Sequence, residues 1–296
     1  MIYRPPRGLG FAIGLLLTLW SAAVGVVVAI AAVSIGIEFE GFLVGLAAIF
    51  FFLLAALFAY WSVACLNVAY IVDRNGLAIQ WGNIRQLVPL DQIQKLVPGA
   101  SVRKPRIRGV GWWGHHVGQG VIRGIGHTLF YSTHRSRREL LYVVTPSQSY
   151  GICVNEPVLF AREIQNRQAM GAVQKVRQAP VRNLLGGQAF WLDRRIQFLL
   201  AFATLLCLSL YGYVFWVYPG LNETISVEFP SLGGVVRLTS KSELLDIPNA
   251  ALGVLVLDVV LALIVHLWQR LLAYIVLLGA AFSQVIFIVA AVIAVN

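Results

Sequence analysis

Long runs of apolar residues alternate with a polar middle section along this chain. A helix needs about 20 apolar residues to cross a hydrocarbon core of about 30 Å, so each long run predicts a transmembrane helix. The first run is longer than the apolar region of a secretory signal peptide, which has about 7–15 residues, and a second run follows at once. We therefore expect a retained first helix and about five spans, at residues 9–35, 41–66, 196–217, 250–268 and 271–295.

The middle section changes to the period of two that is typical of β-strands. Asn75-Gly76 is a strong hairpin signal. Asn155 is a candidate helix N-cap, with Glu156 and Pro157 in the first turn of a helix that should end near Met170. Residues 98–126 are rich in glycine and are expected to form a long loop. The expected strands are residues 67–73, 77–81, 84–88, 92–96, 127–132, 140–145 and 150–154.

Two stretches of this section resemble the bacterial pleckstrin-homology (PH-like) domain. The stretch YIVDRNGLAIQWGNIRQLVPLDQIQKL resembles its opening, which commonly reads as a strand, a GL turn, a strand and then IPLDxI. The stretch TPSQSYGICVNEPVLFAREIQ resembles its last strand and helix, with Asn155 at a position where proline is common. The resemblance covers residues 69–167. It implies an antiparallel β-barrel or sandwich closed by one C-terminal helix, and it brings no catalytic residue.

The predicted protein is thus an α-helical transmembrane bundle of about five spans that carries a cytoplasmic PH-like domain. The first part is a transmembrane hairpin. The PH-like domain and a basic juxtamembrane linker follow it, and a three-span region with an outward loop at 219–249 ends the chain. The corresponding boundaries are residues 1–66, 67–170, 171–195 and 196–296.

Charge sets the expected orientation and the expected partners. The chain is 58% hydrophobic and only 12% charged, with a net charge of +10, and residues 67–195 hold 18 Lys or Arg against six Asp or Glu. The positive-inside rule places the N-terminus, this basic section and Arg270 in the cytoplasm, and the C-terminus outside. Anionic lipid headgroups are the expected partner, with a membrane protein as a further possibility. No helix-turn-helix, zinc-finger or RNP pattern accompanies the charge, so nucleic acid is not expected.

The glycine-rich stretch carries the candidate contact residues. Bases beside tryptophans suit a membrane interface, because cationic groups meet phosphates while indole rings lie at headgroup depth. The alternative is a solvated loop that lies near the bilayer only because the domain is tethered there. The candidate lipid or partner contacts are Arg103, Lys104, Arg106, Arg108, Trp112, Trp113 and Arg123.

No cofactor or metal is expected. Residues 109–114 match G-x-G-x-x-G, but bases precede them and glycines follow, where a dinucleotide site needs a strand and a helix. Adjacent His115 and His116 would point in opposite directions on an extended chain, and neither His127 nor His134 has an acidic or cysteine neighbour in the sequence. Three cysteines without CxxC spacing indicate no disulfide framework.

The predicted spans contain one other group of interest. An ionised carboxylate in the middle of a span costs about 2.5–3.5 kcal/mol on insertion scales, so Asp258 should face the helix bundle. His266 lies about two turns further on, and Ser283 and Gln284 are possible hydrogen-bond partners. These residues form either a proton or ion site or a structural, neutral carboxylic acid between helices. Gly10 and Gly14, and likewise Gly41 and Gly45, have the spacing that allows close helix packing.

Three functions remain open on the sequence. The first is a non-enzymatic multi-pass membrane protein that presents its basic domain to lipid headgroups or to a protein partner, as a scaffold, assembly factor or sensor. The second is a small transporter or ion-conducting bundle that uses Asp258. The third is a membrane enzyme of unrecognised class, which would want clustered acidic and histidine side chains at the lipid boundary.

Overall fold

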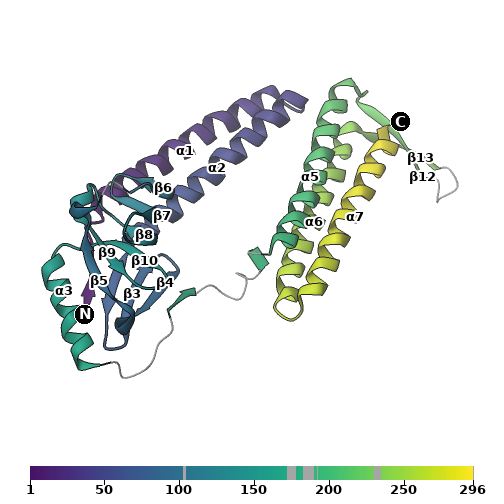
Figure 1. The fold of residues 1–296 in the computed structure, drawn as a ribbon. Helices are drawn as coiled ribbons and strands as arrows, with labels where there is room; N and C mark the ends of the chain where they lie inside the picture. Colours follow the sequence, from purple (N-terminus) through teal and green to yellow (C-terminus); the bar gives the residue numbers. More distant parts are fainter. Residues whose placement is uncertain (103–104, 172–177, 183–189, 192, 230–234, 296) are drawn as a thin grey trace. The chain divides into compact units, whose positions relative to one another are not determined.

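The five apolar runs form five long helices (Figure 1). A computed structural model describes residues 1–102, 105–171, 178–182, 190–191, 193–229 and 235–295 of the chain. By length and composition each of the five helices can cross a membrane, which confirms the prediction of five apolar helices. They are α1 (Gly8–Ile35), α2 (Phe39–Leu66), α5 (Arg194–Val217), α6 (Asp246–His266) and α7 (Arg270–Val295).

The chain divides into two compact units, each of which is described by itself. The first unit comprises Met1–Ala23 and Phe51–Asn183, so it joins one end of the α1–α2 hairpin to the β-rich domain. The second comprises Val24–Phe50 and Leu184–Asn296, with the other end of the hairpin and the last three long helices.

One sheet of the β-rich domain has five strands, and all its described pairs are antiparallel. Three of its strands were predicted from alternation. Its two edge strands were not. One edge strand precedes α1, and the other lies in the segment assigned from sequence to the juxtamembrane linker. In spatial order the strands are β1 (Ile2–Tyr3), β2 (Ala69–Val72), β3 (Gly76–Trp81), β4 (Ile84–Pro89) and β11 (Ala179–Arg182).

The second sheet has six strands and corrects the prediction of a long loop. Residues expected to form that loop instead build a hairpin, whose two strands pair from Arg108 opposite Gln119 to Trp112 opposite His115. The pattern was missed because glycines occupy positions where a strand normally shows apolar residues. In spatial order the strands are β5 (Lys95–Pro98), β9 (Leu140–Val144), β10 (Ser149–Cys153), β8 (Gly126–Ser132), β7 (His115–Ile122) and β6 (Arg108–Trp112).

Two further details differ from the prediction. The described strands form two separate sheets and do not close into a barrel, so only the sandwich alternative fits them. Not every pair is antiparallel, because β10 runs parallel to β8. Strands β8 and β9 are consecutive in the sequence but are not neighbours in the sheet, because β10 lies between them and pairs with both.

The two sheets share one apolar core. Tyr70 of β2 is fully buried there, and its hydroxyl group donates to the Tyr131 carbonyl oxygen of β8 at 2.8 Å and accepts from the Cys153 amide of β10 at 3.1 Å. Helix α3 (Pro157–Met170) contributes the buried side chains of Phe160 and Ile164. Its N-cap residue is Glu156, without a side-chain capping bond, so the prediction of an Asn155 cap is wrong.

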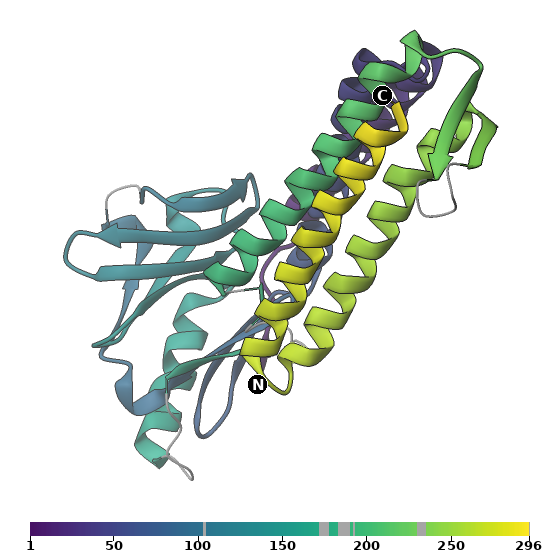
Figure 2. The same ribbon diagram turned by 90° about the vertical axis from the view of Figure 1, so that its right-hand side faces the viewer.

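The last three long helices pack against one another, and they lie side by side in both ribbon views (Figures 1 and 2). Their contact is built largely from small residues, including the fully buried Ala203, Ala262 and Ala280. Small side chains let helix backbones approach closely, which is how membrane helices pack. Within the predicted outward loop, β12 (Thr224–Phe229) and β13 (Val235–Ser240) form an antiparallel hairpin.

Candidate functional site

The turn between β6 and β7 packs directly on the first turns of α1. The indole N–H of Trp112 donates to the Gly10 carbonyl oxygen at 2.8 Å. A Cβ atom on Gly10 would lie 2.1 Å from the carbonyl oxygen of Gly114, and one on Gly14 would lie 2.2 Å from Ser62 Oγ. Two of the four glycines that the sequence associated with helix packing, Gly10 and Gly14, therefore leave room for the β-turn and for helix α2, whereas a Cβ atom on Gly45 would have no neighbour within 4 Å. This close approach fixes the second sheet to one end of the helical hairpin.

Aromatic side chains fill the junction between the sheet and the helices. The Trp112 ring lies 6.2 Å from the rings of Phe58 and Trp61 in α2 and 4.5 Å from the ring of His115. Trp112, which the sequence grouped with the lipid or partner contacts, is thus half-buried and packs inside the protein.

His115 has no exposed surface, and neither of its ring nitrogens has a hydrogen-bond partner among the described residues. Burial, and then the neighbouring His116, lower the pKa of His115 to about 4. The imidazole is therefore neutral at physiological pH and behaves as an aromatic packing group.

A pocket of about 470 Å³ opens beside this junction. Trp113 lies on its rim and is 74% exposed, although the preceding tryptophan faces the helices. Residues 107, 109, 111 and 113 share one face of β6, because successive side chains of a strand point to opposite faces. Gly109 and Gly111 have no side chain that could fill the space between Ile107 and Trp113. The pocket is lined by Pro105, Ile107, Trp113, His116, His134, Arg135, Ser136 and Arg137.

Two stacked histidines form one wall of the pocket. Their ring centroids are 4.0 Å apart at an interplanar angle of 28°. His134 is buried, and its Nδ1 atom lies 2.8 Å from Ser132 Oγ. Burial lowers the pKa of His116, and burial followed by the charge of His116 lowers that of His134 to about 3. Both rings are neutral at physiological pH, so the positive charge of this pocket comes from Arg135 and Arg137.

The structure separates the residues that the sequence grouped as one contact surface. Arg106, Arg108 and Arg123 are exposed, but the last of these lies beyond the end of β7 that is remote from the helices. The eight residues of that strand span about 26 Å. Of the predicted contacts that the structure describes, only Trp113 lines the pocket. Arg103 and Lys104 lie outside the described residues.

Sequence reasoning missed the arginines of the pocket. Arg135 and Arg137 fall between the expected strands 127–132 and 140–145, and neither was among the candidate contacts. They reach the pocket because Ser132 at the end of β8 pairs with His116, which brings the following turn beside Trp113. The basic run 134–138, HRSRR, was a usable signal, but its neighbour across the sheet depends on a register that the sequence did not reveal.

The structure does not bring together the polar residues of the predicted spans, Asp258, His266 and Gln284. Asp258 is half-buried, on the same helix stripe as buried Leu255 and Ala262, and no hydrogen bond or ion pair joins it to another described residue. Gln284 is fully buried, and its amide donates to the Ala251 carbonyl oxygen at 3.0 Å. His266 packs edge-on against Phe190, with ring centroids 5.4 Å apart. Among the described residues, no three His, Cys, Asp or Glu side chains converge as metal ligands would.

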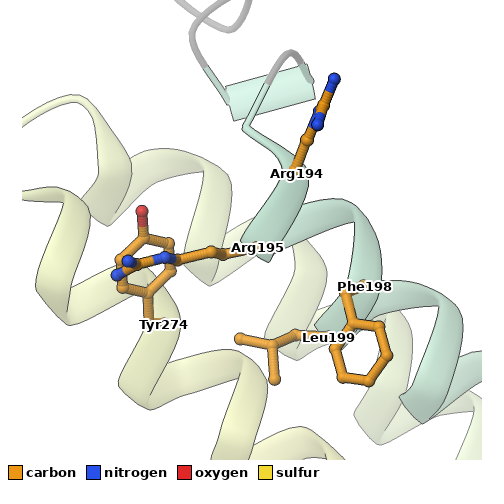
Figure 3. Close-up of a pocket in the computed structure, with 5 residues that line it drawn as sticks. All are labelled: Arg194, Arg195, Phe198, Leu199 and Tyr274. Atoms are coloured by element: carbon orange, nitrogen blue, oxygen red, sulfur yellow. The ribbon is translucent and has the colours of Figure 1, made fainter.

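A second hollow, of about 400 Å³, lies at the start of α5. It is lined by Arg194, Arg195, Phe198, Leu199 and Tyr274, and Figure 3 shows Arg195 extending toward Tyr274 while Arg194 points away. The Tyr274 hydroxyl donates to Asp193 Oδ2 at 2.5 Å, while Asp193 Oδ1 accepts from the Arg195 amide as the N-cap of the helix. The hydrogen bond from Tyr274 is the main reason that the pKa of Asp193 is lowered.

Two sheets around one core, fixed to a hairpin of helices that are long and apolar enough to cross a membrane, define a β-sandwich module. Residues 68–168 match a family model described as the bacterial PH domain. The chain therefore carries a bacterial PH domain, which confirms the resemblance seen in its sequence. No curated protein and no solved structure matches the chain.

Proposed function

We propose that this protein is a non-enzymatic multi-pass membrane scaffold whose PH domain contacts lipid headgroups at the cytoplasmic face of the membrane. The observation that carries the proposal is the packing of the Trp113-Gly114 turn against Gly10. If α1 crosses the bilayer, this contact places the exposed Trp113 side chain beside the end of a membrane span.

The length of α1 gives the approximate depth. Its 28 residues make a helix of about 42 Å, whereas the hydrocarbon core is about 30 Å thick. About eight residues therefore extend beyond the core, and Gly10 lies among them when the far end of α1 is at the opposite boundary. Tyr60, 43% exposed, and Trp61 lie at the same end of the hairpin. Aromatic residues of this kind are typical of the layer between lipid and water.

The charge of the domain supports the same assignment. Bases outnumber acids three to one in residues 67–195, and anionic lipids of the cytoplasmic leaflet attract such a surface by about 1 kcal/mol per nearby base. Arg4 is exposed next to α1, and Arg135 and Arg137 lie beside Trp113. Asp258, the basis of the transporter alternative, has no hydrogen-bonded partner among the described residues, so we do not propose that function.

Spin-label accessibility in the full chain tests this proposal. Trp113→Cys and Arg123→Cys place labels at opposite ends of β7, and the native Cys65, Cys153 and Cys207 are all buried. In nanodiscs that contain phosphatidylglycerol, we expect a label at position 113 to be shielded from a water-soluble nickel chelate and a label at position 123 to be accessible. Equal, high accessibility at both positions would contradict the lipid contact and favour docking to a protein.

A further inference from the structure

We infer that the pocket between Trp113, the stacked histidines and Arg135 and Arg137 is a discrete binding site for the phosphate group of one anionic phospholipid. This inference rests on the proposed membrane contact and adds to it a ligand, a stoichiometry and a set of residues. A basic surface attracts many lipids without selecting a position, whereas a pocket of about 470 Å³ holds one headgroup.

The charges of the pocket fit a phosphate. Arg135 and Arg137 are exposed, and neither guanidinium forms an ion pair with a described acidic side chain. Glu139 is close in sequence, but its carboxylate accepts from the Arg135 backbone amide at 2.8 Å and is thereby held at the turn. Guanidinium groups recognise phosphate through paired, charge-assisted hydrogen bonds. The pocket is therefore cationic, and the described residues that line it include no carboxylate.

The histidine wall supplies polar atoms that the protein leaves without partners. His116 Nδ1 is buried and has no hydrogen-bond partner among the described residues. His134 Nδ1 is engaged with Ser132, and no hydrogen bond involves its Nε2 atom within the described structure. A buried nitrogen without a partner costs free energy that a bound oxygen atom can recover. When His134 Nδ1 accepts from the Ser132 hydroxyl group, the proton of the neutral ring is on Nε2 and can be donated to a phosphate oxygen.

The rim accounts for the lipid part of the ligand. Trp113 is 74% exposed beside the opening, and Ile107 and Pro105 provide apolar surface on the opposite side. Free phosphate would gain nothing from these groups. A glycerophospholipid places its glycerol and the first carbons of its acyl chains against them, because the adjoining turn contacts α1 at Gly10. The ligand class is therefore an anionic glycerophospholipid with an accessible phosphodiester, as in phosphatidylglycerol.

Native mass spectrometry of the detergent-purified full chain tests this site. Phosphatidylglycerol, phosphatidylcholine and inorganic phosphate are titrated separately into the wild type, into Arg135→Gln/Arg137→Gln, and into Arg123→Gln/Arg138→Gln. The two double variants lose the same charge from exposed positions, and Arg123 and Arg138 do not line the pocket. We expect one phosphatidylglycerol adduct to weaken by about tenfold or more in the first variant and to persist in the second.

Equal weakening of phosphatidylglycerol binding in both double variants would overturn the discrete site and leave only a general electrostatic attraction. The spin-label experiment tests the membrane contact separately. A response to inorganic phosphate without a response to phosphatidylglycerol would overturn the lipid assignment. Equal affinity for phosphatidylcholine would overturn the requirement for an anionic headgroup. Unchanged thermal unfolding of both double variants establishes that loss of binding is not loss of fold.

Discussion

Trp112 donates its indole N–H to the carbonyl oxygen of Gly10 at 2.8 Å, across 102 positions of the sequence. The bond joins the edge strand of the second sheet to the first helix of the chain. The carbonyl belongs to the first turns of α1, and the donor ring is enclosed by Phe58, Trp61 and His115. The orientation of the sandwich relative to this end of the hairpin therefore depends on a small, well-defined contact.

Substitution of Trp112 tests the strength of that contact. Trp112→Phe keeps an aromatic ring and removes the hydrogen bond, so we expect a loss of about 1 kcal/mol in the free energy of unfolding. Trp112→Ala also leaves a cavity and should cost about 3–5 kcal/mol. Thermal unfolding in detergent measures both. Trp113→Phe is the matched control, and it should change stability by no more than about 0.5 kcal/mol because its ring is exposed.

The close approach at Gly10 gives a second prediction. A Cβ atom there would meet the Gly114 carbonyl at 2.1 Å, and backbone atoms on both sides leave little room to move. We expect Gly10→Ala to destabilise the protein by about 1–3 kcal/mol, as overpacking does. Gly45→Ala in α2 is the control, since a Cβ atom at that position has no neighbour within 4 Å. Equal stability of the two variants would show that the turn does not pack on α1.

The buried His115 ring predicts a loss of stability in acid. Its pKa in the folded protein is about 4, below the ordinary value of about 6.5, so the unfolded chain binds the proton more strongly. The contribution is complete above about pH 6.5 and is lost as the pH falls toward 4, to a limit of about 3 kcal/mol.

Thermal unfolding between pH 7 and pH 4 tests the role of His115. His115→Phe should flatten part of the pH dependence, while His116 and His134 keep theirs. His127→Gln is the control, because His127 is exposed. An unchanged slope in His115→Phe would contradict the assignment.

The two kinds of element differed in how far sequence could predict them. A membrane span is decided by the hydrophobicity of its own residues, so all five long helices were predicted with bounds close to those observed. Strands with a clear local pattern were also predicted, such as β3, which alternates, and β9, which is an unbroken apolar run. Strand β1 has only two residues, and it forms because Ile2 pairs with Ile71 after the whole of the α1–α2 hairpin. A pattern in the local sequence cannot predict a pairing partner so far away along the chain.

The sequence failed to predict the glycine-rich hairpin and the pocket for related reasons. Gly109 and Gly118 pair across β6 and β7, and a Cβ atom on Gly118 would lie 2.5 Å from the Arg108 carbonyl oxygen. Glycine was read as a loop signal, although here it allows close packing within a sheet. The sequence grouped the two tryptophans as one contact, but the two side chains face different environments. The pocket arginines depend on the pairing of β7 with β8, which is a tertiary property.

The hydrogen bond from Tyr274 to Asp193 predicts a specific response to acid at the start of α5. Asp193 caps this helix through the Arg195 amide, and the Tyr274 bond lowers its pKa. A carboxylate with a lowered pKa stabilises the folded state above its unfolded pKa of about 3.9, and this contribution is lost as the pH falls through the folded value. Tyr274→Phe should raise the pKa of Asp193 and therefore move the loss of stability to higher pH.

Thermal unfolding between pH 5 and pH 3 measures this shift. Tyr213→Phe is a suitable control, because the Tyr213 hydroxyl forms no hydrogen bond within the described part of the chain. Because Tyr274 acts through one carboxylate, Tyr274→Phe should have little further effect when Asp193→Asn is already present. Additive effects of the two substitutions would instead mean that the Tyr274 hydroxyl group acts independently of Asp193, and that the cap of α5 does not depend on α7.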